Sequence, residues 1–255
     1  MIMDNKPIIL VGNDDGIEAR GLKSLIEFLA PMGELYVAAP ATHQSAKSSS
    51  LTMDTPLRVD RLDDYMGARM FRINGTPVDC TKMALNRLLP RRPDLIVAGI
   101  NHGANSGSNV IYSGTMGVVF EGCLAGIPSI GFSLLDYRPN ADFSACRPIV
   151  EQITADVLAN GLPADVCLNV NIPAGSDIKG IKVCRAAHGT WTEEFEQRTD
   201  PFGRNYYWIT GSYSNTEPDS IDTDLYYLEH GFASVVPCRP DQTAHDAIAL
   251  LASRL

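Results

Sequence analysis

Short apolar runs alternate with amphipathic stretches through the first 170 or so residues of the chain. The apolar runs occur at residues 7–12, 35–39, 95–100, 127–134 and 166–172. Short continuous runs of this kind are typical of strands that are covered on both faces. Apolar residues at helical spacing predict helices over residues 21–30 and 143–158, and helix-start residues predict two more over residues 76–89 and 113–125. Residues 57–73 favour a hairpin insertion. Strands that alternate with helices form parallel βαβ units, so the pattern predicts an α/β fold with a doubly wound, mostly parallel, Rossmann-like sheet.

The regular alternation stops near residue 180. Beyond it, short strand-like runs, the aromatic cluster Tyr206-Tyr207-Trp208 and loops rich in Pro, Asp and Ser take over. We expect residues 1–255 to form a single domain, with an α/β core over residues 1–180. Residues 181–255 would then be a C-terminal extension that carries a β-rich arm.

Composition narrows the classes of partner. The formal net charge is −9 and the isoelectric point is near 5.0, so no excess of basic residues exists to neutralise a nucleic-acid polymer. A small nucleotide is not excluded, because a metal ion can offset its charge locally. No apolar run approaches the roughly 18 residues of a membrane helix, and Met1–Lys6 lacks the design of a secretion signal. The six cysteines form no CxxC pair and are expected to be buried thiols, which makes the cytoplasm the expected location.

The ends of the predicted strands are where an open α/β sheet collects ligands. The first strand ends in Asn13-Asp14-Asp15-Gly16. Two adjacent carboxylates repel each other unless a cation lies between them, and hard divalent ions prefer oxygen ligands of this kind. The competing interpretation is that one of these aspartates simply caps the next helix.

Two further segments bring oxygen ligands and anion-binding groups to the same edge. The loop after the second strand offers hydroxyls at Ser45, Ser48, Ser50 and Thr52, and the third strand ends in Asn101, whose amide oxygen is a neutral ligand. Gly103 and its neighbours allow backbone N–H groups to approach an anion, and Ser113-Gly114-Thr115 begins a helix whose dipole favours phosphate. Each segment alone could be an ordinary loop or helix cap. Together they predict metal-assisted hydrolysis of a phosphate ester.

With these motifs the sequence resembles the SurE family of stationary-phase survival proteins, which act as 5'(3')-nucleotidases. The matching segments are Asn13–Gly16, the loop 40–52, Gly75–Cys80, Gly99–Gly107, and Ile111–Thr115 with Glu121-Gly122. The resemblance covers nearly the whole chain and is strongest over residues 7–135. It implies a phosphomonoesterase that acts on nucleoside 5'-monophosphates, and possible further substrates are 3'-monophosphates and short polyphosphate.

The resemblance also assigns roles to residues. It implies that Asp14, Asp15, Ser45 and Asn101 hold one divalent cation per subunit, Mn²⁺ or Mg²⁺, and that the two aspartates are catalytic. Substrate and phosphate contacts are expected from a second group: Asn13, Gly103, Asn105, Ser113, Gly114 and Thr115. One departure is Ala46, because the family usually has Gly directly after the metal serine. If that position needs a positive φ, Ala costs about 1 kcal/mol there and the loop carrying Ser45 could sit differently.

Oligomers are a further implication of the resemblance. A homodimer or homotetramer is expected through the C-terminal arm, for which residues 191–215 are the candidates. The aromatic side chains of this segment would suit an interface: Phe195, Phe202, Tyr206, Tyr207 and Trp208. A satellite cluster within one subunit is the alternative.

Several other polar residues have more than one interpretation. His43 and His102 lie in the site loops and could contact substrate, whereas Asp79 has the position of a capping-box acid. Glu121 could lie near the site or form a salt bridge. Asn169 and Asn171 share one face of the fifth strand and favour structural hydrogen bonding.

Two other classes of function share part of this pattern. A receiver domain also has paired acids after its first strand, but it needs an Asp where this chain has Asn101. It also needs a Lys after the fifth strand, where none follows at once here, and it is about half this length. A nucleotide-binding regulatory module without catalysis is the second alternative.

Overall fold

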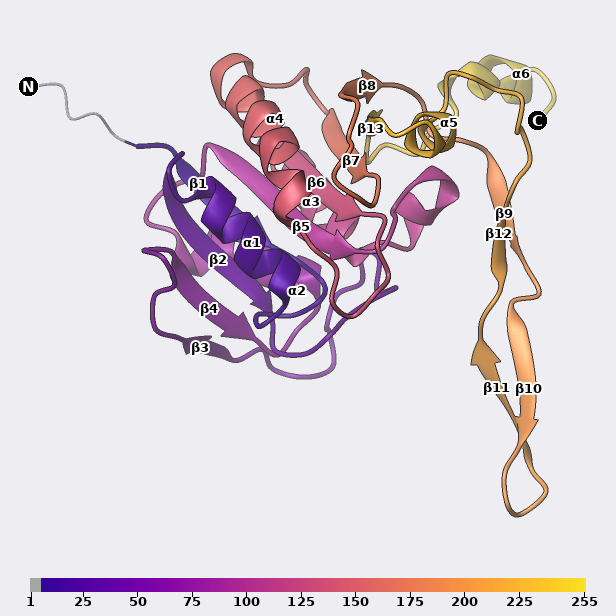
Figure 1. Ribbon diagram of the computed structural model, residues 1–255, viewed down its shortest axis with the longest axis horizontal. Coiled ribbons are helices and arrows are strands. Elements are labelled where there is room, and N and C mark those ends of the chain that lie inside the picture. Colours follow the sequence, from indigo (N-terminus) through magenta and orange to yellow (C-terminus); the bar gives the residue numbers. More distant parts are fainter. Residues whose placement is uncertain (1–5) are drawn as a thin grey trace, which may run out of the picture.

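The fold is organised around one nine-stranded sheet (Figure 1). The computed structural model describes residues 6–255. In chain order the strands of this sheet are β1 Ile8–Gly12, β2 Glu34–Pro40, β3 Val59–Arg61, β4 Arg69–Ile73, β5 Leu95–His102, β6 Ser129–Leu134, β7 Cys167–Ile172, β8 Ile181–Val183 and β13 Ala233–Cys238. Their spatial order is β3-β4-β2-β1-β5-β6-β7-β13-β8. Six central strands from β4 to β7 are parallel, while β3 runs antiparallel to β4, and β13 runs antiparallel to β7 but parallel to β8. The doubly wound, mostly parallel sheet is therefore confirmed.

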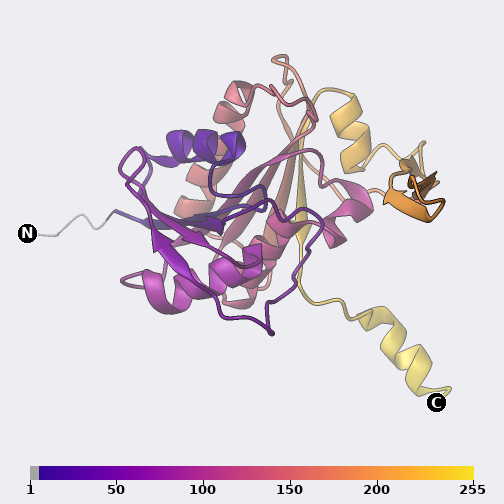
Figure 2. The same ribbon diagram turned by 90° about the horizontal axis from the view of Figure 1, so that it is seen from below.

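Both faces of the sheet are covered by helices (Figures 1 and 2). The helices α1 Arg20–Leu29 and α4 Arg147–Asn160 contribute to one apolar cluster, and α2 Pro77–Met83 and α3 Gly114–Leu124 contribute to the other. Strand β1 shows why its sequence is apolar without interruption. Ile9 and Val11 lie in the first cluster, whereas Ile8 and Leu10 lie in the second, because successive side chains point to opposite faces.

The predicted elements of residues 7–172 are present, with ends that move by a few residues. The hairpin insertion forms β3 and β4, and β4 adds to the edge of the sheet beside β2. The predicted helix over residues 76–89 is α2 followed by a π-helical turn, η1 Ala84–Leu88. Two 3₁₀ segments were not anticipated, η2 Gly107–Ile111 and η3 Ser144–Cys146.

The C-terminal region divides into a part that joins the sheet and a part that leaves it. Strands β8 and β13 extend the sheet beyond β7, and α5 Asp224–Glu229 packs near β13. Between them the chain runs out along an arm built from two antiparallel pairs, which Figure 1 shows projecting from the body. The inner pair is β9 Gly189–Thr192 with β12 Ser212–Asn215, and the outer pair is β10 Phe195–Thr199 with β11 Asn205–Ile209.

The chain ends in a short 3₁₀ turn, η4 His245–Ala247, and the helix α6 Ile248–Ala252, which lies away from the body in Figure 2. Ile248, Leu250 and Leu251 are exposed on this last segment. No helix within residues 6–255 is long and apolar enough to span a membrane. The N-terminal stretch considered for a secretion signal lies outside the described residues up to position 5. All six cysteines are free, and four of them are buried: Cys80, Cys123, Cys146 and Cys167.

Candidate active site

The carboxyl ends of β1 and β5 form the edge at which the predicted site residues meet. Strand β1 pairs with β2 on one side and with β5 on the other, so the chain reverses its direction of winding at this point. Such switch points open a crevice beyond the strand ends, where ligands bind in α/β proteins. Asn13, Asp14 and Asp15 follow β1, Asn101 is near the end of β5, and α3 begins beside them.

Asp14 is a buried carboxylate that lies against the start of α3. Its Oδ1 accepts a hydrogen bond of 2.6 Å from the Thr115 hydroxyl. The backbone of Gly114 approaches so closely that a Cβ there would lie 2.7 Å from Asp14 Cβ and 2.8 Å from Oδ2. Burial raises the pKa of Asp14 to about 6, against the lowering effect of the Thr115 hydrogen bond, and the charge of Asp15 raises it further. Glycine at position 114 is therefore required for this carboxylate to reach the helix terminus.

Asp15 lies at the same edge but is less deeply buried. Its Oδ2 accepts the backbone N–H of His102 at 3.2 Å, and its Oδ1 lies 3.4 Å from Nδ1 of the exposed His43. Burial raises the pKa of Asp15, while the His102 N–H and the two histidines oppose that rise. Both histidines of the site loops thus lie near this carboxylate.

Asn101 is brought to the edge by an irregularity in β5. The register with β6 shifts between Ala98 and Asn101, and bulges of this kind redirect side chains. The Oδ1 atom of Asn101 is 3.5 Å from the Thr115 hydroxyl, which donates its closer bond to Asp14. The Asn101 amide donates to the carbonyl of Gly103 at 2.9 Å. Thr115 consequently joins the oxygen atoms of Asp14 and Asn101 across two different strands.

The start of α3 presents a helix N-terminus to this group of oxygens. Ser113 is the N-cap, and its hydroxyl accepts the N–H of Met116 at 3.0 Å. The first turn contains Gly114, whose backbone lies against Asp14, and Thr115, whose hydroxyl donates to Asp14. The N–H groups at the start of a helix favour an anion through their partial positive charge. The predicted cap and the predicted anion-facing helix start are the same structural feature.

The loop over residues 41–52 passes along the same edge. The N–H of Gln44 donates to the carbonyl of Asp14 at 2.7 Å, which places the neighbouring Ser45 close to the site in sequence and space. Ser45 is exposed, and within residues 6–255 its hydroxyl forms no hydrogen bond. Ala46 has φ of +58°, the left-handed conformation in which a Cβ is unfavourable. The condition for strain at this departure from the family pattern is thus met.

Two predicted contact residues are already engaged within the protein. The N–H of Gly103 donates to the carbonyl of Leu134 at 2.9 Å. The buried amide of Asn105 donates to the Ser133 hydroxyl at 2.8 Å, and the Asn105 N–H donates to Asn171 Oδ1 at 2.8 Å. These bonds hold the loop after β5 in place and leave no free N–H at Gly103 for a ligand.

Other side chains with open interpretations are now explained. Asn169 and Asn171 have the predicted structural role, since Asn169 donates to the Asn105 carbonyl and Asn171 donates to Asn169. Asp79 completes a capping box with Thr76 and also accepts the Thr52 N–H. Glu121 pairs with Lys82 at 2.6 Å, so it forms the salt bridge that was one of its two interpretations.

The residues at this edge suit a hard cation. Within residues 6–255, no Lys or Arg forms an ion pair with Asp14 or Asp15, so their charge lacks a basic partner. Asn13 donates to the Gly16 carbonyl at 2.9 Å, but its buried Oδ1 has no hydrogen-bond partner in the described part of the chain. The same part of the chain contains no group of three or more His, Cys, Asp or Glu arranged around a metal position. A cation here would therefore need the neutral oxygens of Asn and Ser in addition to the carboxylates, a ligand set that suits Mg²⁺ or Mn²⁺.

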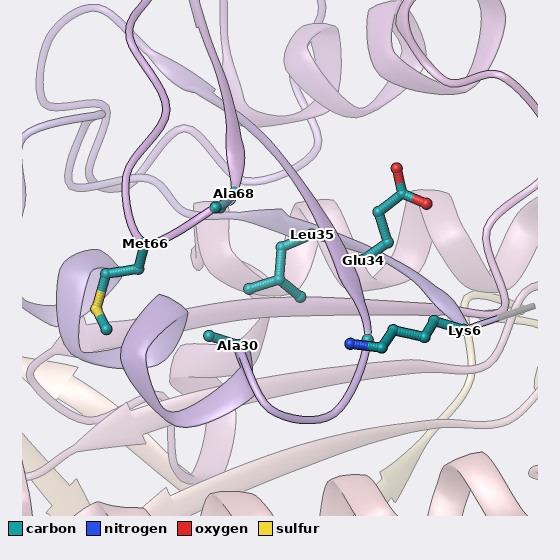
Figure 3. A pocket seen from close by; sticks show the side chains of 8 residues that line it. Lys6, Ala30, Glu34, Leu35, Met66 and Ala68 are labelled. Atoms are coloured by element: carbon teal, nitrogen blue, oxygen red, sulfur yellow. The ribbon is translucent and has the colours of Figure 1, made fainter.

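Clefts elsewhere do not compete with this edge. One of about 470 Å³ lies at the amino ends of β1, β2 and β4, and its lining includes Lys6, Glu34 and Met66 (Figure 3). Another of about 340 Å³ lies between Leu51–Leu57 and α2, with an apolar lining that includes Met53 and Met83. Neither cleft is lined by the paired aspartates.

Known proteins resemble this chain both in sequence and in structure. Residues 9–193 match the family model described as survival protein SurE. The protein named 5'-nucleotidase SurE from Christiangramia forsetii is 49% identical over 252 residues, which span 97% of this chain and 96% of the relative. That of Bacteroides fragilis is 47% identical over 244 residues, spanning 95% of this chain and 96% of the relative. The crystal structure of the SurE protein from Aquifex aeolicus superposes with a TM-score of 0.84 at 35% identity and covers 97% of this chain and 99% of that one. Fold, site order and similarity over nearly the full length agree: this chain belongs to the SurE family.

Proposed function

We propose that the chain is a phosphomonoesterase that hydrolyses nucleoside 5'-monophosphates to nucleoside and phosphate with the help of a divalent cation. The observation that carries the proposal is the buried Asp14, which lies beside Asp15 and the first turn of α3 and has no Lys or Arg partner among residues 6–255. Curated relatives at 46–49% identity bear the name 5'-nucleotidase, which supports the substrate class.

The proposed cation ligands are Asp14, Asp15, Ser45 and Asn101. Asp14 and Asn101 already share the Thr115 hydroxyl, and the loop of Ser45 is bonded to the Asp14 carbonyl. A bound Mn²⁺ or Mg²⁺ would supply positive charge against the phosphoryl oxygens and lower the pKa of a nearby water. One ion per subunit is proposed, because one pair of carboxylates lies at this edge.

The remaining steps fall to the protein. The N–H groups of Gly114 and Thr115, at the positive end of α3, would bind the phosphoryl oxygens. Asp15 is the proposed acceptor for the proton of the attacking water, since it is more accessible than Asp14. The water oxygen forms a bond to phosphorus as the bond to the ester oxygen breaks, and the leaving nucleoside oxygen takes up a proton from solvent, which balances the proton that Asp15 accepts. His43, 3.4 Å from Asp15, is placed to exchange that proton with solvent.

The exposed strands of the arm support a proposal for how the chain assembles. We propose that the single domain of residues 1–255 forms homodimers or homotetramers through the arm, whose outer strands β10 and β11 are exposed along their whole length. The extension 181–255 would then serve both the sheet, through β8 and β13, and association, through the arm. The acidic charge supports a small nucleotide as partner, and six free cysteines support a cytoplasmic location.

A substrate panel tests the proposal. Phosphate release would be measured from 5'-AMP, 5'-GMP, 3'-AMP and short polyphosphate, first with a chelator and then with Mn²⁺ or Mg²⁺. Release from the 5'-monophosphates that requires the added metal is the expected result. Nucleotide binding without phosphate release under every metal condition would favour a regulatory module and overturn the proposal.

A further inference from the structure

The short segment η2 is held at three consecutive residues, by the start of α5 and by the base of the arm. The N–H of Gly107 donates to Asp224 Oδ2 at 2.7 Å. The N–H of Ser108 donates to the Tyr213 hydroxyl at 3.0 Å. Asn109 Oδ1 accepts the indole N–H of Trp191 at 2.8 Å. These three partners, Trp191, Tyr213 and Asp224, are called the η2 clamp below.

The η2 clamp is tightly packed. Asp224 is fully buried, and its other oxygen accepts the N–H groups of Ala187 and Leu225 at 2.8 Å each. Trp191 and Tyr213 face each other across β9 and β12, with ring centroids 5.8 Å apart in an edge-to-face arrangement. At Gly107, where φ is +57°, an added Cβ would lie 2.4 Å from the Tyr213 hydroxyl. The backbone of η2 thus lies directly against the Tyr213 hydroxyl at the base of the arm.

The other end of η2 is bonded to the site loops. The carbonyl of Ile111 accepts the Ser48 hydroxyl at 2.6 Å, and the carbonyl of Tyr112 accepts the Ser48 N–H at 3.1 Å. Ser48 belongs to the loop that carries Ser45. The next residue after Tyr112 is Ser113, the cap of α3. A displacement of η2 would therefore reach both the loop of Ser45 and the first turn of α3.

We propose that Trp191, Tyr213 and Asp224 are positioning residues that hold the phosphate-binding helix start in its productive place, so that the arm and the active site are mechanically coupled. This inference rests on the proposed function for its kinetic consequences, but the coupling itself is a property of the fold. The inner pair β9–β12 continues directly into the exposed outer hairpin (Figure 1). A partner surface that immobilises the outer hairpin would also stabilise the position of η2, because hydrogen bonds and packed side chains connect the two.

Backbone hydrogen exchange tests the coupling without any reference to activity. Tyr213→Phe removes the acceptor of the Ser108 N–H and keeps the aromatic ring. We expect amides over residues 106–117 to exchange about tenfold faster in this variant, since one buried bond stabilises local structure by about that factor. Tyr65→Phe is the matched control, because it deletes a tyrosine hydroxyl bonded to Glu27 at 2.8 Å near the opposite end of the sheet. Unchanged exchange over 106–117 in Tyr213→Phe would overturn the proposal.

Kinetics test what the coupling does. If the wild-type enzyme releases phosphate as proposed, Tyr213→Phe should raise the KM for 5'-AMP and the inhibition constant of inorganic phosphate together, by about fivefold to tenfold. The kcat should change less than about twofold, because the clamp residues do not touch the reacting atoms. A general loss of folding would instead lower the amount of active enzyme and leave KM unchanged. Equal KM values for Tyr213→Phe, Tyr65→Phe and wild type would contradict the positioning role.

A double variant guards against a Tyr213→Phe effect that arises elsewhere. Gly107→Ala introduces a Cβ against the Tyr213 hydroxyl, so it should impair phosphate binding more than Tyr213→Phe does. In Gly107→Ala/Tyr213→Phe that hydroxyl is absent, and the combined effect should be smaller than the product of the two single effects. Strict multiplicativity would show that the two residues do not act through one contact. A wild-type protein without nucleotidase activity would refute the proposed function but leave the exchange experiment decisive for the clamp.

Discussion

The carboxyl edge of the sheet and the outer hairpin of the arm differ in which side chains are buried and which are exposed. At the edge, acidic and amide groups are buried: Asp14 and Asn13 are 3% and 1% exposed. On the hairpin, apolar groups are exposed: Phe202 and Ile209 are 83% and 81% exposed. Both arrangements are costly for an isolated chain, because burial penalises charge and exposure penalises apolar surface. The difference supports the proposed cation at the first region and the proposed self-association at the second.

The largest expected effect comes from neutralising the buried acid. Asp14→Asn should lower kcat by at least about a hundredfold, because the charge that complements the cation is lost. The fold should survive, since a neutral amide is easier to bury than a carboxylate whose pKa is raised to about 6. Phosphate release and thermal unfolding would be measured together.

Asp63→Asn provides the control for this change, because Asp63 is exposed and lies in the connection between β3 and β4, away from the candidate site. It should leave both measurements at their wild-type values. An Asp14→Asn enzyme with normal turnover would remove the buried carboxylate from the site.

The arm gives the second largest effect, and it concerns assembly. Replacing exposed Trp208 and Ile209 by Ser should weaken self-association by about thirtyfold or more, since a buried interface Trp commonly contributes about 2 kcal/mol. Light scattering over a dilution series would measure the association constant. Met66→Ser, at an exposed methionine outside the arm, should leave it unchanged. Equal association in the two variants would show that the hairpin is not the interface.

The third prediction concerns how the stability of the base of the arm depends on pH. The Arg185 guanidinium lowers the pKa of Glu217 to about 2, from an ordinary value of 4.5, and the His188 N–H assists. A lowered carboxyl pKa stabilises the fold above the ordinary value, and this stabilisation is lost as the pH falls from about 4.5 to about 2. Glu217→Gln should therefore flatten the stability profile in that window. Urea midpoints at several pH values would measure it, and a profile that coincides with wild type would refute this role of Glu217.

The smallest effect is expected at the strained loop position. Ala46→Gly should raise the free energy of unfolding by about 0.5–1 kcal/mol, because φ of +58° is readily adopted by Gly and not by Ala. Ala41→Gly, in the same loop but without a positive φ, should lower it slightly through the entropy of the unfolded chain. Equal shifts in the two variants would mean that the conformation of Ala46 costs nothing.

Local pattern was sufficient for the strands and helices of the core, because each follows from burial on one or two faces. The apolar run of β1 required helices on both sides, and they are present in the two clusters. Adjacent carboxylates after β1 predicted the edge of the sheet at which the oxygen atoms meet. The strand order was not accessible in the same way: neither the antiparallel insertion of β13 next to β7 nor the addition of β4 beside β2 has a local signature.

At the candidate site, residue type alone did not distinguish ligand groups from supporting ones. Gly103 and Asn105 have the chemistry of anion contacts, yet their N–H and amide groups are bonded to Leu134, Asn171 and Ser133. Which polar group is free depends on neighbours that come from distant segments. The same holds for Thr115, whose hydroxyl joins two strands that are separated by more than 80 residues of chain.

The chain's linear pattern determined the layered α/β architecture and the presence of paired acids, a terminal amide and a helix start along one edge, since hydrophobic periodicity and the order of motifs are properties of neighbouring residues. The tertiary structure decided that Asp14 lies in contact with Gly114, that Ala46 takes a left-handed conformation, and that α5 and the base of the arm bind η2. These features depend on contacts between residues up to 117 positions apart. Their geometry is set by the packing of the whole sheet and not by the preferences of any short segment.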